Sequence, residues 1–426
     1  MNGESEGDIT LVDSGAPRSA MLGPLDLALA PLRPRPRRPL PREKSALAIW
    51  FWEIDRVLLG LIVVLLAIGL VAVAAASPVG ALKLAKDSGQ ETAPLYYFYR
   101  QIIWIIVGLP VMFVASMLPR TQIRRISVVA TIAFMLLLAL VPYLGDDAKG
   151  ATRWIGYGFF RFQPSEFLKP VFAITVAWLL SLRARDPSLP VIPLTAMLTA
   201  IVALLLMRQP DFGQTVVFCA CWAALLLIGG ASMRLMGAVV AAGVGLFVAV
   251  YMFYANGRER INSFLFPVKD PLAGPDQVEL AHRTITHGGL TGVGPGGGTA
   301  KFNLPEAHTD YIFSVIGEEF GLIACIAIAL VYLAVVVRVM LRLLDEEDPF
   351  VLLAASGLVI QIGLQAMINI AVNIDVAPSK GMTLPFISYG GSSMIALCGA
   401  VGLLLAFTRR NPYKSRSPYV MTWSGR

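Results

Sequence analysis

The sequence is poor in charge, because only 15% of its 426 residues are Asp, Glu, Lys or Arg. Soluble domains carry about 25% charged residues, so this deficit excludes an ordinary soluble protein. Apolar residues take the place of charge, with 56% hydrophobic content and a mean hydropathy of +0.68. The 35 basic residues exceed the 28 acidic ones by only seven. In a membrane protein such an excess anchors the cytoplasmic side, so we expect no nucleic-acid partner.

Cysteine and histidine are also scarce. The four cysteines all lie inside apolar runs: Cys219, Cys221, Cys325 and Cys398. Buried thiols in such runs behave as small hydrophobic groups, which predicts no disulfide and no structural metal. The three histidines fall within residues 282–308 without the spacing of metal ligands.

The chain divides into two tails and one apolar domain. Residues 1–50 alternate Pro and Arg near positions 33–39 and predict a disordered, basic cytoplasmic tail. They do not resemble a signal peptide, because the positive charge follows the apolar stretch. Residues 51–410 form the membrane domain, and residues 411–426 form a cytoplasmic C-terminal tail.

Apolar runs long enough to cross a bilayer recur along the membrane domain. They lie at about residues 54–76, 101–118, 125–144, 163–182, 191–207, 212–229, 235–255, 311–337, 350–373 and 387–407. The fold class is therefore an all-α polytopic membrane protein with about ten transmembrane helices. Because Lys and Arg stay cytoplasmic, their positions in the short connections place both termini inside. The fifth and sixth spans could instead form a re-entrant pair, since only four residues separate them.

A large extracytoplasmic loop, residues 256–309, lies between the seventh and eighth spans. It contains a formal G-x-G-x-x-G at Gly292, Gly294 and Gly297. No strand precedes this match and no βαβ unit fits here, so we interpret the run as a flexible loop rather than a dinucleotide site.

Ionisable residues inside membrane spans are functional candidates by default, because burying them in lipid is unfavourable. Pro164 suits the first turn of the fourth span, and Glu166 lies three residues before Lys169 on the same helix face. The two side chains can pair. A structural ion pair and a substrate-binding role are both open from the sequence, and the position of the pair near the outer end slightly favours the second.

Further charges lie at the same predicted membrane face. Arg208 and Asp211 flank a short turn, for which ordinary turn chemistry is the alternative. Asp310 precedes the eighth span, and a solvated helix N-cap is its alternative role. If the helix were continuous, Glu318 and Glu319 would lie at the membrane interface.

Two polar segments complete this face. Gln361, Gln365, Asn369 and Asn373 recur every four residues along the ninth span. Such a stripe commonly makes interhelical hydrogen bonds, and lining of an outward-facing cavity is the other possibility. Residues 375–393 return as a polar segment whose hydroxyl and amide groups suit an anion, with capping of the tenth span as the alternative.

The predicted topology brings many of these charges together. Residues expected at the outer face are Arg153, Glu166, Lys169, Arg208, Asp211, Asp310 and Lys380. Cations suit a pyrophosphate and a carboxylate suits a general base. The residues therefore favour a site for an amphiphilic phosphorylated lipid whose reactive head lies outside.

Several ordered motifs resemble the SEDS family of shape, elongation, division and sporulation proteins. They lie at residues 149–155, 161–166, 209–213, 304–319 and 380–393, and the resemblance spans about residues 50–410. The run Pro378–Phe386 looks like the division members more than the elongation members. The resemblance implies a peptidoglycan glycosyltransferase that polymerises lipid II in the outer leaflet of the inner membrane, at the division septum. It also implies a class B penicillin-binding transpeptidase and other divisome proteins as partners, in contact with membrane lipid.

The same resemblance assigns roles to residues. The family's essential aspartate falls on Asp310, which would take the proton from the acceptor sugar's 4-hydroxyl while the donor's undecaprenyl diphosphate leaves with inversion. The candidate substrate-binding residues are Arg153, Trp154, Glu166, Lys169, Arg208, Asp211, His308, Lys380, Ser388 and Ser392. No protein metal site is expected, and a divalent cation at the pyrophosphate is the only cofactor that the reaction suggests.

Two functions from other classes stay open at this point. A transporter that flips the same lipid-linked precursor would need polar groups along a path through the bilayer, and the stripe on the ninth span supplies some. A non-catalytic divisome scaffold would not need the polar outer cluster.

Overall fold

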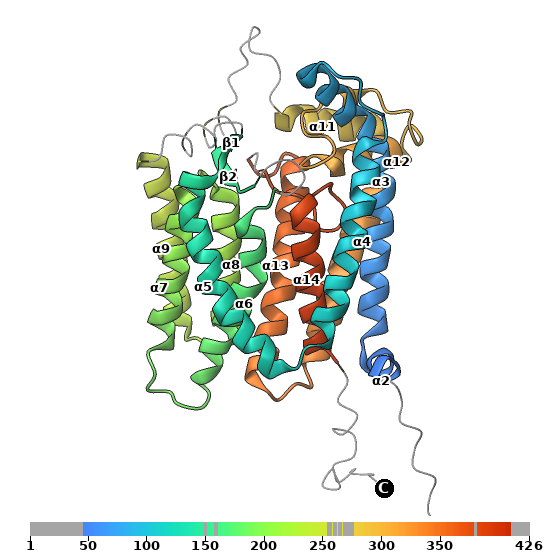
Figure 1. Cartoon of the computed structure of the whole chain (residues 1–426). Coiled ribbons are helices and arrows are strands. Elements are labelled where there is room, and N and C mark those ends of the chain that lie inside the picture. The colour runs from blue at the N-terminus through green and yellow to red at the C-terminus, as the bar shows by residue number, and fades with distance from the viewer. Residues whose placement is uncertain are drawn as a thin grey trace, which may run out of the picture. The chain divides into compact units, whose positions relative to one another are not determined.

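Figure 1 shows the computed structural model of the chain. The structure describes residues 46–148, 151–156, 161–253, 258, 262, 266, 277–378 and 381–409. The chain separates into two compact units, Met1–Ile49 and Trp50–Arg426, and the description below concerns the second. Residues 1–45 and 410–426, which hold most of the two predicted tails, lie outside the described residues. Helix α2 (Ala46–Glu53) begins inside the segment predicted as disordered, because Ala46–Trp52 is a continuous apolar run.

The membrane domain consists of long apolar helices. They are α3 (Arg56–Ser88), α4 (Tyr96–Met117), α5 (Arg120–Leu144), α6 (Pro164–Leu182), α7 (Val191–Met207), α8 (Phe212–Ile228), α9 (Met233–Phe253), α12 (Ile312–Leu343), α13 (Pro349–Asn373) and α14 (Gly391–Phe407). Each predicted span overlaps one of these helices. Among the described residues, seven are long and apolar enough to cross a membrane, whereas α7, α8 and α14 are shorter apolar helices. The protein is a helical, multi-pass membrane protein, and the count of ten spans stays a prediction.

Local sequence explains where several helices begin. Asp55 caps α3 by accepting from the amides of Val57 and Leu58, and Asp348 caps α13 by accepting from the amide of Phe350. Pro164 occupies the first turn of α6, as the sequence predicted. A side-chain oxygen at the N-cap satisfies amides that the helix itself leaves unpaired.

Helix α3 is longer than predicted, because it continues past residue 76 to Ser88. Its 33 residues span about 50 Å, which exceeds the roughly 30 Å hydrocarbon core. The extension is held by Ser77, whose hydroxyl donates to the Pro94 carbonyl and accepts from the amide of Tyr97. Gly89 ends the helix with a φ of 67°, a left-handed conformation that glycine adopts easily.

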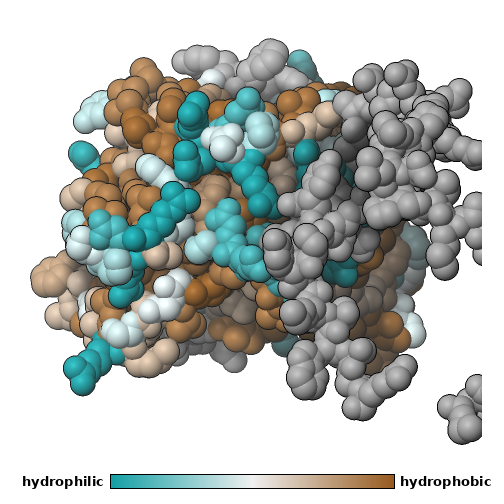
Figure 2. Space-filling model, turned by 90° about the horizontal axis from the view of Figure 1, so that it is seen from below, coloured by the Kyte–Doolittle hydropathy of each residue, from teal (hydrophilic) through white to brown (hydrophobic). Residues whose placement is uncertain are grey.

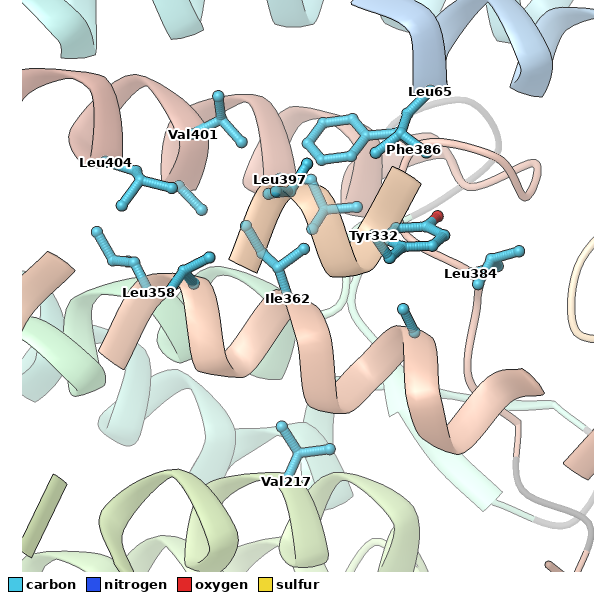
Figure 3. Packing of buried hydrophobic residues seen from close by; sticks show 14 of the residues in the cluster. Leu65, Val217, Tyr332, Leu358, Ile362, Leu384, Phe386, Leu397, Val401 and Leu404 are labelled. Atoms are coloured by element: carbon cyan, nitrogen blue, oxygen red, sulfur yellow. The ribbon is translucent and has the colours of Figure 1, made fainter. Parts of the chain in front are cut away.

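The core lies where α13 and α14 pack against α12, α6 and α4. Figure 3 shows Leu358 and Ile362 of α13 facing Leu397, Val401 and Leu404 of α14. Tyr332 of α12 is buried in the same cluster and donates its hydroxyl to the Pro385 carbonyl. In contrast, large apolar side chains of α4, α5 and α9 are exposed on the outside of the bundle, where lipid would cover them.

The two ends of the bundle differ (Figure 1). We call the end that carries strands β1 (Asp146–Ala148) and β2 (Ala151–Trp154) and helix α11 (Gln277–Gly288) the hairpin end. The opposite end holds Asp55 and is called the Asp55 end. The strands pair antiparallel, which is a small departure from the all-α prediction. Residues 145–148 are small or acidic, so the sequence showed no strand pattern there. An isolated antiparallel β-bridge joins Ile155 to Phe162, between the hairpin and α6.

The large loop 256–309 is partly helical, since it contains α11 and the 3-10 helix η2 (Ala300–Asn303). Its glycine-rich run, expected to be a flexible loop, is instead fixed against α12. The amides of Val293 and Gly294 donate to the carbonyls of Glu318 and Glu319, each at 3.0 Å. Helix α12 is broken there, because Gly321 has non-helical torsions of φ 79° and ψ 178°.

Glycine is required at this contact. A Cβ added to Gly288 would lie 2.0 Å from the Gly317 carbonyl oxygen, and one added to Gly292 would lie 2.2 Å from that of Glu319. A Cβ on Gly321 would lie 2.3 Å from the Leu290 carbonyl oxygen. The loop and the broken helix therefore approach each other backbone to backbone.

Candidate functional site

Asp310 lies at the hairpin end, in the connection between η2 and α12. Its backbone carbonyl accepts hydrogen bonds from two amide side chains of α13, Asn369 at 2.8 Å and Asn373 at 3.1 Å. The N-cap of α12 is Tyr311, without a side-chain cap bond. The alternative role of Asp310 as a helix N-cap is therefore wrong, because the helix begins one residue later than that role needs.

Arg153 approaches the same point from the hairpin. Its Nε donates to the Gln209 carbonyl at 3.2 Å and its Nη2 to the Pro210 carbonyl at 2.6 Å. A Cβ on Gly381 would lie 3.5 Å from Asp310 Oδ2 and 3.6 Å from Arg153 Nη1. The carboxylate of Asp310 and the guanidinium of Arg153 thus both border Gly381.

Asp211 is the buried member of this group, at 4% exposure. It caps α8 through the amide of Gln214, accepts from Gln163 Nε2 at 3.2 Å, and lies 4.0 Å from Arg153 Nε. Burial raises the pKa of Asp211, although the charge of Arg153 and the Gln214 amide oppose that rise. The turn alternative is correct in part, because Asp211 has an ordinary capping bond as well as the ion pair.

Glu166 and Lys169 pair as their spacing predicted, but deeper in the bundle. Lys169 Nζ lies 2.8 Å from both carboxylate oxygens of Glu166 and donates to Gln365 Oε1 at 2.8 Å. Glu166 also accepts from Gln214 Nε2 at 2.7 Å. Both charged side chains are buried, at 4% and 3% exposure, which favours the structural ion pair over direct substrate binding.

The polar stripe of α13 makes interhelical hydrogen bonds, the more common of the two predicted uses. Gln365 joins Lys169 of α6 to the Thr383 carbonyl, and Asn369 also donates to the Met382 carbonyl. Asn373 Oδ1 accepts from the hydroxyl and the amide of Ser314 on α12. The stripe therefore fixes the segment around residues 382–383 and the connection that carries Asp310.

His308, Ser388 and Ser392 are buried, and the first two support this connection. The His308 ring lies 4.0 Å, centroid to centroid, from that of Tyr97. Ser388 Oγ donates to the Thr309 carbonyl at 2.6 Å and accepts from the amide of Leu384. Ser392 Oγ accepts from the Gln163 amide at 3.3 Å instead of capping α14, whose N-cap is Gly390. Their predicted contact with substrate stays a prediction.

The remaining predicted residues are accessible or undescribed. Trp154 ends β2 and is partly exposed, and Arg208 ends α7 with an exposed side chain. Within the described part of the chain, Arg208 makes no ion pair with the group around Arg153. Lys380 lies outside the described residues.

Glu318 and Glu319 are not at an interface, contrary to the expectation for a continuous helix. Both are buried, because the loop 288–301 covers them. Glu318 accepts from the amides of Thr299, Ala300 and Lys301 at 2.7–2.9 Å. Glu319 pairs with Lys301, whose Nζ also donates to the Ala75 carbonyl of α3.

Sequence reasoning missed several residues that organise the site. Lys301 lies in a loop and gave no signal, although it is 2% exposed and joins that loop to α3 and α12. Gln163 lies three residues before Glu166 and Gln214 three residues after Asp211, and this spacing was the only available signal. In the fold Gln163 bonds Asp211 and Gln214 bonds Glu166. Gly381 needed the structure, because only the fold brings it between Arg153 and Asp310.

The arrangement is suited to acid–base chemistry on an anionic substrate. A carboxylate fixed through its backbone stands beside a guanidinium that can hold a phosphate, at the end of a membrane bundle. The fold and this site define a polytopic membrane protein with a charged, partly exposed site at one membrane face.

Comparison with known proteins gives the family. The family model described as "Cell cycle protein", which covers FtsW, RodA and SpoVE, matches residues 56–413. The chain belongs to this family.

Curated relatives agree along nearly the whole chain. A protein of Caulobacter vibrioides named "Probable peptidoglycan glycosyltransferase FtsW" is 36% identical over 373 residues, which is 87% of this chain and 93% of the relative. A protein of Allochromatium vinosum with the same name is 36% identical, over 89% of this chain and 94% of the relative.

Solved structures are similar in fold. One, described as "Structural coordination of polymerization and crosslinking by a peptidoglycan synthase complex", aligns with a TM-score of 0.66 at 29% identity, covering 83% of this chain and 97% of its own. The rod shape determining protein RodA of Thermus thermophilus aligns with a TM-score of 0.61 at 27% identity, covering 83% and 96%.

Proposed function

We propose that the protein is a peptidoglycan glycosyltransferase that polymerises lipid II at the outer face of the cytoplasmic membrane, in the septal cell-wall synthesis of cell division. The observation that carries this proposal is that the Asp310 carboxylate and the Arg153 guanidinium both border Gly381 at the hairpin end. The relatives named as probable peptidoglycan glycosyltransferases support the reaction class.

In this mechanism Asp310 is the general base. Its carboxylate takes the proton of the acceptor sugar's 4-hydroxyl while that oxygen attacks the anomeric carbon of the lipid-linked donor. The bond from the anomeric carbon to the undecaprenyl diphosphate breaks with inversion, and the diphosphate leaves with the electron pair. Arg153, which borders Gly381 together with Asp310, stabilises the charge that develops on the leaving group.

The buried residues of the site hold this geometry. Asn369 and Asn373 fix the Asp310 carbonyl, and the Gln209 and Pro210 carbonyls fix the guanidinium of Arg153. Positioning of this kind contributes to rate because reacting groups start close to their transition-state geometry. Glu166 and Lys169 act one layer deeper, through Gln365 and Gln214.

A divalent cation remains part of the proposal. The described residues contain no group of three or more His, Cys, Asp or Glu that could hold a metal by themselves. Mg²⁺ is usually held by one or two carboxylates together with substrate phosphates, so the cation would arrive with the diphosphate.

We also propose a class B penicillin-binding transpeptidase as partner, in a complex that includes other divisome proteins. The similarity to a structure described as a peptidoglycan synthase complex supports a partner of this kind. A polymerase and a cross-linking enzyme act on the same strand, which makes their association useful.

The test is polymerisation of labelled lipid II by the purified protein with its cognate transpeptidase. Asp310→Asn keeps the shape and removes the base, and should lower the rate of polymerisation about 10²- to 10⁴-fold. Asp375→Asn is the matched control, because Asp375 is exposed and has a φ of 59°, which Asn tolerates.

Full polymerisation by Asp310→Asn would remove Asp310 from the base role. No polymer from the wild type, with the partner bound, would favour transport or scaffolding instead. The transporter alternative has little support, since the α13 stripe is buried and Gln365, Asn369 and Asn373 bind neighbouring groups.

A further inference from the structure

A second polar cavity lies at the Asp55 end, away from the proposed site. It has a volume of about 420 Å³ and is formed where α5 begins and where α12 and α14 end. Its lining carries four arginines, Arg120, Arg338, Arg342 and Arg409, against Asp345 and Glu346. The excess of positive charge gives the cavity an affinity for anions.

Two of the arginines already have a counter-charge. Arg338 donates to both oxygens of Asp55 at 3.0 and 3.1 Å, and Arg342 donates to the same carboxylate at 3.1 Å. Arg120 has a weaker partner, since its Nη2 lies 3.8 Å from Glu346 Oε2 and its side chain is 37% exposed. The unbalanced charge is therefore at the Arg120 and Arg409 side of the cavity.

Arg409 is the most unusual of the four. Among the contacts of the described residues, its buried Nε and Nη2 atoms have no hydrogen-bond partner. Burial lowers the pKa of Arg409; Glu53 opposes that change, and the positive charge of Arg120 adds to it. Buried donors in native proteins are almost always bonded, so a ligand acceptor is expected beside this guanidinium.

Aromatic residues near the cavity are of the kind found at a membrane–water interface. Directly beside Asp55, the guanidinium of Arg56 stacks on the rings of Phe51 and Trp52, which are 50% and 66% exposed. Exposed aromatic residues of this kind mark the headgroup level of a bilayer. Leu341 lines the cavity and is 58% exposed, and Figure 2 shows hydrophilic and hydrophobic residues mixed across this end.

We propose that the cavity is a binding site for a phosphate-bearing anion, held by the guanidinium groups of Arg409 and Arg120. Guanidinium groups bind phosphate oxygens in pairs and keep their charge at any physiological pH. The ligand source that this position favours is the headgroup of an anionic phospholipid in the inner leaflet, with an acyl chain along Leu341. Basic pockets between membrane helices on the cytoplasmic side commonly bind such headgroups. Free phosphate has the same chemistry and is the other source.

The test uses native mass spectrometry of the full chain in detergent, titrated with dioleoyl phosphatidylglycerol, dioleoyl phosphatidylcholine or inorganic phosphate. Removing an arginine near a lipid headgroup should weaken binding roughly 5-fold, so Arg409→Gln with Arg120→Gln should weaken it about 25-fold. Arg185→Gln is the matched control, because Arg185 is exposed on a short connection on the same predicted side.

Each arm has a defined meaning. Phosphatidylglycerol that binds the wild type and the control but is lost from the double variant supports the site with a lipid as source. The same pattern with inorganic phosphate supports it with free phosphate as source. Equal binding of every probe to wild type and double variant, or no binding to either, would overturn the proposal.

Single variants and thermal midpoints show whether a loss of binding is caused by misfolding. Arg409→Lys keeps the charge but loses the paired donors, so its binding should fall between those of the wild type and Arg409→Gln. The thermal midpoint of each variant without added lipid shows whether it is folded. None of these measurements depends on glycan polymerisation, so the outcome is separate from that of the proposed function.

Discussion

Two charged clusters lie near the hairpin end, and they differ in how completely their groups are paired. The cluster of Glu166, Lys169, Gln214 and Gln365 is buried, and its two charges have partners on three helices. The cluster of Arg153, Asp211 and Asp310 is partly exposed, and its Arg153–Asp211 distance is a loose 4.0 Å.

The difference separates two roles for charge in one membrane protein. A buried ion pair with short bonds to neighbouring side chains fixes helices and leaves little capacity for a ligand, although Gln214 Oε1 has no hydrogen-bond partner among the described residues. A partly exposed cluster with longer distances can exchange its partners for those of a substrate. Changes in the first cluster should therefore lower stability, and changes in the second should lower activity with the fold intact.

The largest expected effect is that of Lys169→Met, which leaves Glu166 buried without its ion pair. Breaking a buried pair by removing one partner costs about 3–5 kcal/mol, so the thermal midpoint should fall sharply. Thermal unfolding in detergent measures this fall in the thermal midpoint. Lys86→Met, on the exposed end of α3, is the control and should change little.

The double variant Glu166→Gln with Lys169→Met sharpens this result. Because it removes both charges, it should recover most of the stability that Lys169→Met loses. A double variant as unstable as the single one would mean that packing, and not the unpaired charge, causes the loss.

Arg153→Gln should have the next largest effect, mainly on rate. Loss of a single donor to a developing negative charge lowers rates about 10²- to 10³-fold. The thermal midpoint should fall less than that of Lys169→Met, since Arg153 is partly exposed and its ion pair with Asp211 is long, at 4.0 Å. An Arg153→Gln protein that unfolds as readily as Lys169→Met would erase the distinction between the clusters.

Asn369→Leu tests the connection between them, because Asn369 lies one turn from Gln365 and bonds the Asp310 carbonyl. The Met382 carbonyl would lose its bond to this side chain, at about 1–3 kcal/mol, and polymerisation should fall as Asp310 shifts. Gln361→Leu on the same helix is the control. Gln361 Nε2 has no partner among the described residues, so this change should be nearly neutral in both assays.

The smallest expected effect is a pH dependence of stability that Asp55 causes at the Asp55 end of the bundle. Burial alone would raise the pKa of Asp55, but hydrogen bonds from Arg338 and Leu58 and the charge of Arg342 lower it below its usual value. A carboxyl with a lowered folded-state pKa adds stability above its unfolded pKa of about 4 and loses it as the pH falls through the folded value.

Wild type should therefore exceed Asp55→Asn in stability by about 1.5–3 kcal/mol at pH 7, toward the lower value because Arg338 is partly exposed. The two should converge as the pH falls below about 4. Thermal midpoints between pH 3 and pH 7 measure this. Glu347→Gln, at an exposed position, should follow the wild type throughout.

Much of the fold could be predicted from the sequence because lipid imposes a simple rule on each span. Every predicted apolar run overlaps a helix, and the pairing of Glu166 with Lys169 followed from their spacing. The length of α3 could not be predicted, since the rule for spans says nothing about turns beyond the hydrocarbon. The helix continues there because Ser77 bonds the Pro94 segment, which is a tertiary contact.

The site was predictable in its residues but not in its geometry. Asp310 and Arg153 are 157 positions apart in the chain, and only the packing of β2 and the loop after α13 brings them to Gly381. The burial of individual charged residues also could not be predicted from the sequence. Glu318 looked interfacial, yet the break at Gly321 and the loop above it place its carboxylate among three backbone amides.

The backbone contact between the glycine-rich loop and α12 has a consequence for how the gene can vary. Any missense change at Gly288, Gly292 or Gly321 adds a Cβ where a carbonyl oxygen already lies within 2.3 Å. Neither segment can absorb such a change by altering its own side chains, because main-chain atoms make the contact. Selection should therefore hold these three positions as strictly as Asp310, although no chemistry occurs at them. Invariance along this loop would then record a packing constraint and should not be taken as a sign of a second active site.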